Sequence, residues 1–89
     1  MGYYQDVYSS PELHGLRIVE THEAPDLSYE FDMVVLWEDI KTRKRYWARD
    51  SGCSCPSPFE NVRSVSELND WSLTKREYEQ EVKGVLGRP

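Results

Sequence analysis

The chain has 89 residues, enough for one small domain, and its 38% hydrophobic, 12% aromatic and 30% charged content is typical of a folded soluble protein. The net charge of −5 argues against direct nucleic-acid binding, which needs excess positive charge to displace counterions from phosphates. No apolar run reaches the length of a membrane span, and the first residues lack a signal peptide's basic and apolar regions. We therefore expect a cytoplasmic protein with reduced cysteines.

The charges are unevenly distributed along the chain. Residues 1–39 hold nine acidic side chains and one basic one, Arg17, whereas residues 41–49 hold five basic side chains and no acidic one. This pattern favours an acidic protein with a solvated basic hairpin, in which Lys41 and Arg43 are candidates for contacting a charged partner. The acidic stretch is most simply a solvated face, and a surface that imitates a nucleic-acid backbone is the alternative.

The N-terminal half predicts an arm followed by strands. Residues 1–13 show no period of 2 or 3.6, so we expect an irregular Tyr-rich arm, held to the body by its tyrosines (Tyr3, Tyr4, Tyr8) and by Leu13. Leu16 to His22 alternates as a strand. Tyr29 to Glu38 is the clearest strand, and its alternate residues form one apolar face: Tyr29, Phe31, Met33, Val35 and Trp37. Its second face is also partly apolar, which indicates a central strand.

The second half predicts a hairpin and a helix. A loop of four to five residues within 39–44 leads into a strand from Arg45 to Arg49, which Asp50-Ser51-Gly52 ends. Residues 65–70 have the spacing of one helical turn. Thr74 to Leu86 is predicted to be a helix with Thr74 and Glu77 as a capping box, Leu73 and Tyr78 as a hydrophobic staple, and Gly87 as its end.

These elements predict a single α+β domain over residues 1–89. It comprises the arm (1–13), the sheet with a Cys-Pro loop (14–71) and the C-terminal helix (74–86). We expect a small antiparallel sheet of three or four strands with the helix packed on one face. The Cys-Pro loop should fold back against Trp37, Trp47 or Phe59. A small sheet leaves open edges, so a homo-oligomer is a further possibility.

The Cys-Pro loop contains both cysteines, Cys53 and Cys55, and three interpretations apply to them. The favoured one is structural, with small thiols packed under the loop. A zinc site would need Cys53 and Cys55 together with His14 or His22, although one residue between thiols is not usual finger spacing. A disulfide between residues two apart would be strained and labile.

No catalytic constellation is evident in the sequence. A nucleophilic cysteine needs a nearby base, and the two histidines are far from the cysteines in sequence. No glycine-rich phosphate loop is present either. We therefore expect a protein that is not an enzyme and has no cofactor, with Ser57, Phe59 and Glu60 as a second candidate contact surface.

The segment Asp50-Ser51-Gly52-Cys53-Ser54-Cys55-Pro56-Ser57-Pro58-Phe59-Glu60 resembles a family of small uncharacterised proteins encoded mainly by phages of actinobacteria. Tyr8 to Leu16 and the strand start Tyr29-Glu30-Phe31-Asp32 support the resemblance, which extends to about Trp71. It implies a phage protein acting in a bacterial cytoplasm, and such proteins often bind a host factor. Our expectation is a non-enzymatic binder that modulates a host or phage protein, and the alternative is a small zinc-binding domain.

Overall fold

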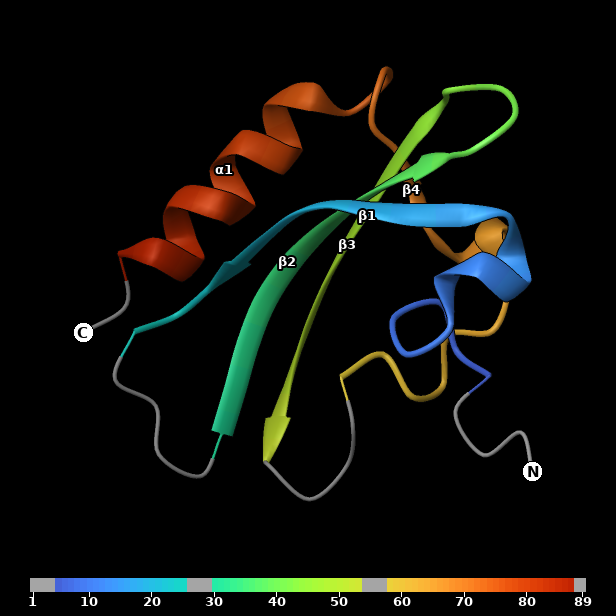
Figure 1. Ribbon diagram of the computed structural model, residues 1–89. Coiled ribbons are helices and arrows are strands. Elements are labelled where there is room, and N and C mark those ends of the chain that lie inside the picture. Colours follow the sequence, from blue (N-terminus) through green and yellow to red (C-terminus); the bar gives the residue numbers. More distant parts are fainter. Residues whose placement is uncertain (1–4, 26–29, 54–57, 88–89) are drawn as a thin grey trace.

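The computed structural model of the protein describes residues 5–25, 30–53 and 58–87 (Figure 1). Its centre is a four-stranded antiparallel sheet in the order β1-β2-β3-β4. The strands are β1 (Leu16–Glu23), β2 (Glu30–Asp39), β3 (Arg45–Cys53) and β4 (Asn69–Asp70). The helices are α1 (Lys75–Leu86) and two short 3-10 helices, η1 (Pro11–His14) and η2 (Val65–Glu67). The predicted small α+β fold, an antiparallel sheet with one C-terminal helix, is confirmed.

Strand β2 is central, as its apolar pattern predicts. It pairs with β1 on one side and with β3 on the other. Met33, Val35 and Trp37 belong to a core on one face, and Val34 and Leu36 belong to a second core on the face toward α1. Both faces are buried because each is covered by a different part of the chain.

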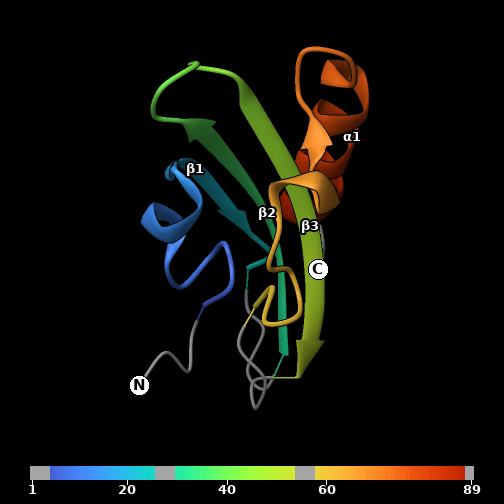
Figure 2. The ribbon, with the colours of Figure 1, turned by 90° about the vertical axis from the view of Figure 1, so that its right-hand side faces the viewer.

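The sheet therefore lies between two layers (Figure 2). Helix α1 covers one face, and its core consists of Val34, Leu36, Trp47, Tyr78 and Val85. The N-terminal arm and the segment 58–68 cover the other face, with a core of Val7, Leu16, Met33, Val35, Trp37, Phe59 and Leu68. The cover on this second face is a feature that sequence periodicity did not predict.

The arm is held to the body by Val7 and by the predicted anchor Tyr8, whose ring centre lies 5.8 Å from that of Phe59, rather than by Leu13. The indole Nε1–H of Trp37 donates to the carbonyl of Val7 at 3.0 Å, and the Val7 N–H donates to the carbonyl of Val62 at 3.0 Å. The Leu13 side chain, expected to be an anchor, is 66% exposed. Residues 11–14 form η1 instead of irregular chain, since proline favours the first turn of a helix. Tyr3 and Tyr4 lie outside the described residues.

Strand β3 continues past Gly52, where the sequence predicted its end. Gly52 pairs with Phe31 of β2, and the strand extends to Cys53. A Cβ atom at position 52 would lie 3.3 Å from the Phe31 ring. Gly52 therefore allows the Phe31 ring to approach the strand closely, and it does not end the strand in a turn.

Helix α1 has the predicted bounds, but its start is stabilised differently. The Thr74 side chain makes no capping hydrogen bond; its hydroxyl accepts from the Trp47 indole N–H at 2.8 Å and donates to the Asp70 carbonyl at 2.6 Å. Leu73 is 81% exposed, so the predicted staple is also wrong. Contacts with the sheet replace the local cap. Within the described ranges, no helix has the length and apolar character that crossing a membrane requires.

Candidate functional site

The β2–β3 hairpin has a tip that the Asp39 carboxylate organises. That carboxylate accepts the backbone N–H groups of Lys41 at 2.8 Å and Thr42 at 2.9 Å, and these bonds hold its pKa below the ordinary value. The Asp39 N–H donates to the Lys44 carbonyl at 2.7 Å, which closes the loop. Arg43 adopts a left-handed conformation with φ 66°. The turn therefore presents its basic side chains from a hydrogen-bonded backbone.

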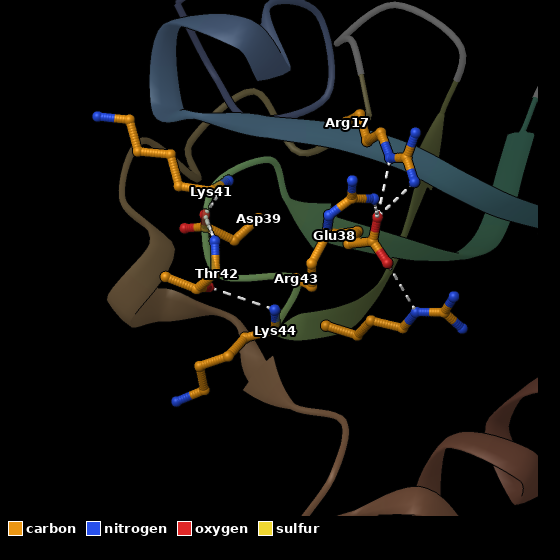
Figure 3. A network of polar contacts seen from close by, with 8 residues as sticks. Arg17, Glu38, Asp39, Lys41, Thr42, Arg43 and Lys44 are labelled. Atoms are coloured by element: carbon orange, nitrogen blue, oxygen red, sulfur yellow. Dashed lines mark hydrogen bonds and ion pairs between the residues drawn. The ribbon is translucent and has the colours of Figure 1, made fainter.

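Beside this turn, three arginines surround the carboxylate of Glu38 (Figure 3). The Arg17 Nε–H donates to Glu38 Oε1 at 2.9 Å, the Arg45 Nε–H donates to Oε2 at 3.3 Å, and Arg43 Nη1 lies 3.5 Å from Oε1. The strand register explains the meeting, because Glu38 of β2 pairs with Arg17 of β1 and with Arg45 of β3. The bond from Arg17 is the main cause that lowers the pKa of Glu38.

Burial distinguishes the carboxylate from its partners. The Glu38 side chain is 7% exposed, whereas those of Arg17 and Arg43 are 57% and 70% exposed. In Figure 3, the side chains of Lys41 and Lys44 extend away from Glu38. We call the surface formed by Arg17, Lys41, Arg43, Lys44 and Arg45 the basic hairpin end.

The basic hairpin end continues toward the start of α1 through Trp71. The Arg45 guanidinium lies 5.7 Å from the centre of the Trp71 ring, and the Lys75 ammonium lies 4.6 Å from it. The Lys44 ammonium is 3.6 Å from a carboxylate oxygen of Asp70. These contacts make one continuous cationic surface over the ends of β1, β2, β3 and the first turn of α1.

This arrangement can bind an anion. An arginine carries five N–H donors in a planar fork, so the three guanidiniums that share the single Glu38 carboxylate have donors to offer a second one. Bidentate pairing with a carboxylate is the geometry that this fork favours. Arginine stays protonated at all ordinary pH values, so the cluster is suited to binding rather than to proton transfer.

The structure separates the predicted contact residues into two groups. Lys41 and Arg43 are exposed at the basic hairpin end. Phe59 is 1% exposed, and its ring packs edge-on against Trp37 with ring centres 5.3 Å apart. The prediction of Phe59 as a contact side chain is therefore wrong, because the ring fills the core. Glu60 is exposed, and Ser57 lies outside the described residues.

Glu60 is also distant from the basic hairpin end along the sheet. The Phe59 N–H donates to the Asp50 carboxylate at 2.7 Å, and Asp50 pairs with Met33. Met33 is five residues from Glu38 on β2, a separation of about 17 Å. The predicted residues thus do not form a single surface.

The histidine and cysteine candidates are only partly described. His14 lies two residues before Leu16, which pairs with Asp39 at one end of β2, whereas Cys53 pairs with Glu30 at the other end. Along β2 these ends are about 30 Å apart. The structure therefore does not bring His14 to Cys53.

The two imidazoles have other neighbours. His14 Nε2 is 2.6 Å from the carbonyl oxygen of Gln5, and His22 Nε2 is 3.3 Å from Glu20 Oε1. Cys55 lies outside the described residues. The Cys53 side chain is also outside the described part, and across residues 5–25, 30–52 and 58–87 no three His, Cys, Asp or Glu side chains converge as a metal site would require. Zinc binding stays a prediction.

Sequence reasoning missed Arg17, Glu38 and Arg45 as members of the site. The basic run 41–49 was visible, but the charges on β1 and β2 that join it depend on strand pairing. Arg17 alternates with Leu16 and Ile18, and the register then places it opposite Glu38. The signal available in the sequence was Arg17, the one basic side chain among the acidic residues of 1–39.

Comparisons with known proteins give one match. The model of a family described as a domain of unknown function, DUF7574, matches residues 5–88. No curated protein and no solved structure matches the chain.

Proposed function

We propose that this chain, which belongs to the DUF7574 family of domains of unknown function, is a non-enzymatic binding protein that docks its basic hairpin end on an acidic surface of another protein. The observation that carries the proposal is the concentration of exposed cations around one buried carboxylate, on a protein whose net charge is −5. A basic surface on an acidic protein attracts an acidic surface of a partner and fixes the orientation in which the two proteins dock.

An acidic protein fits this surface better than a nucleic acid does. Carboxylates at Glu38, Asp39 and Asp70 lie within or beside it, so its cations suit separate anionic groups better than a continuous phosphate backbone. The Trp71 ring is covered by the cations of Arg45 and Lys75, which a stacking base would have to displace. Separate carboxylates on a partner can instead match the guanidiniums individually.

The resemblance to phage-encoded proteins supports a partner from the bacterial host or from the phage itself. A compact protein with a pre-formed charged surface can associate quickly with such a partner, because its hairpin loses little conformational freedom on binding. The chain modulates that partner by covering part of its surface and need not catalyse a reaction.

The test compares two variants with the same change in net charge. Lys41→Glu with Arg43→Glu reverses two exposed cations at the basic hairpin end, and Arg63→Glu with Lys83→Glu reverses two exposed cations outside the cationic surface. Fluorescence anisotropy would follow binding of a labelled glutamate-rich peptide and a labelled single-stranded DNA, at low salt and at physiological salt. We expect the unmodified chain and the second variant to bind the peptide, and the first variant to lose roughly tenfold or more in affinity.

Two outcomes would contradict the proposal. Tighter binding of the DNA than of the peptide would favour a nucleic-acid function. Equal loss of peptide binding in both variants would mean that net charge, rather than the basic hairpin end, determines association.

A further inference from the structure

A second surface of opposite character lies along β1, beside the basic hairpin end. Strand β1 is the outermost strand, and among the described residues its only strand partner is β2. Helix α1 runs across the face of the sheet beside β1 (Figure 1). Between them is a groove of about 270 Å³, lined by Glu20, His22, Tyr78, Glu79, Val82 and Lys83.

The floor of this groove is held in place by the Tyr78 side chain. The phenol O–H donates to Glu20 Oε1 at 2.8 Å, and the ring meets the His22 ring edge-on at 6.4 Å. Tyr78 itself is buried and packs on Trp47 at 5.7 Å. The groove is therefore a fixed depression between the strand and the helix.

An exposed apolar stripe extends the groove along α1. Leu86 follows Val82 by one turn and Tyr78 by two turns, so the three side chains share one side of the helix. Leu86 is 52% exposed, and Val82 is partly exposed. An apolar side chain entering beside β1 would bury both residues.

The open edge of β1 supplies the other half of a docking site. A strand at the end of a sheet has peptide N–H and C=O groups directed outward, ready to pair with an extended segment. A segment added to β1 directs alternate side chains toward α1, because side chains alternate between faces. Those side chains would enter the groove, which is the geometry of peptide recognition by strand addition beside a helix.

Charge selects the occupant. Glu20 and Glu79 line the groove and Glu23 is exposed at the end of β1, whereas Lys83 is the one lysine or arginine among the residues that line it. A second copy of this chain, paired through β1, would bring these carboxylates against their own counterparts, which is unfavourable. A basic segment complements them.

We propose that an extended basic segment of a partner protein binds here, pairing with Glu20 to Glu23 as an additional strand and placing one apolar side chain against Val82 and Leu86. This site has other residues than the basic hairpin end and takes the opposite charge.

The experiment uses three synthetic peptides of about ten residues, a length that matches one strand. The first places lysines and one central valine at alternate positions, so that they share one face, with threonine between them. The second has the same sequence with N-methylated central residues that cannot donate to a ladder, and the third replaces each lysine with glutamate. Amide shifts and hydrogen exchange of the isotope-labelled chain report binding. We expect saturable binding of the first peptide alone, with slowed exchange in β1 and shifts from Val82 to Leu86.

Matched variants locate the site. Glu79→Lys reverses a charge at the groove, and Glu77→Lys makes the same change on the opposite side of α1. We expect the first to weaken lysine–valine binding by roughly tenfold and the second to leave it within about twofold. The Lys41→Glu, Arg43→Glu variant should bind this peptide as the unmodified chain does.

Three results would overturn the inference. Equal binding of the N-methylated peptide would exclude strand addition, and equal binding of the glutamate peptide would exclude the charge argument. A concentration-dependent dimer with protected β1 amides in the absence of peptide would make a second copy the occupant.

Discussion

The pair formed by Asp32 and Arg49 joins β2, β3 and α1 on the helix-covered face, and the two residues should differ in the cost of their removal. Arg49 donates to both carboxylate oxygens of Asp32, at 2.8 and 2.6 Å, and to Glu81 of α1 at 3.1 Å. The Asp32 side chain is 1% exposed and that of Arg49 is 30% exposed. Arg49→Met, which keeps the aliphatic packing, therefore leaves a carboxylate inside the protein without its guanidinium.

The magnitudes follow from that asymmetry. Breaking a buried pair by removing one partner costs about 3–5 kcal/mol, and we expect Arg49→Met to fall in this range. Asp32→Asn should cost only about 1–2 kcal/mol, because the Arg49 guanidinium keeps Glu81 and can reach water. The double variant should be more stable than Arg49→Met alone, since it also removes the buried charge that has lost its guanidinium. The free energy of unfolding of a domain of this size is about 4–13 kcal/mol, so these differences are a large share of it.

Urea unfolding followed by tryptophan fluorescence would measure all three free energies of unfolding. The slopes should be unchanged, and the midpoints should follow the order Asp32→Asn, double variant, Arg49→Met from most to least stable. The reasoning would be refuted if Asp32→Asn cost as much as Arg49→Met. It would also be refuted if the double variant lost the sum of the two single losses.

Three further predictions concern Tyr78, the acidic residues and Phe59. Tyr78→Phe should lower the unfolding free energy by about 1 kcal/mol in thermal melts, because it removes one hydrogen bond to the half-exposed Glu20. Burial raises the pKa of Tyr78 above its unfolded value of 10.0, so stability should fall as pH rises above 10 and ultraviolet titration should show one late-ionising tyrosine. Hydrogen bonds from Tyr78 to Glu20 and from Arg17 to Glu38 lower the pKa of each carboxyl below 4.5, so denaturation curves should show stability lost as pH falls below that value and retained above it. Phe59→Gly should be less destabilising than Phe59→Ala by about 1 kcal/mol in urea, because φ is 60° at this position and both changes delete the same ring.

The elements that the sequence predicted are those with a strong local pattern. The apolar alternation of Phe31, Met33, Val35 and Trp37 predicted β2, and the apolar residues on its second face, Val34 and Leu36, predicted its central place. The bounds of α1 followed from its period and from Gly87. Both patterns involve residues that are close together in the sequence, so they can be recognised without knowledge of the tertiary contacts.

The predictions that failed concern residues whose partners are distant in sequence. Thr74 has every local mark of an N-cap, yet its hydroxyl accepts from the indole of Trp47, which is 27 residues earlier in the chain. Gly52 has the local mark of a turn, yet its role is set by the Phe31 ring on the neighbouring strand. In the same way, five cations between 41 and 49 indicated a basic hairpin, but the buried carboxylate at its centre required the pairing of Arg17 with Glu38.

One irregularity in β1 decides which residues reach the groove beside α1. Ile18 pairs with Trp37 and Glu20 pairs with Leu36, so Val19 is an extra residue that forms a β-bulge. Regular alternation would place Glu20 on the same face as Ile18, away from α1. With the bulge, Glu20 and His22 face the helix, and Glu20 accepts the Tyr78 hydrogen bond. The bulge also interrupts the outer edge near Val19, which protects that half of the strand from unspecific pairing and leaves Glu20 to Glu23 as the segment open to a partner.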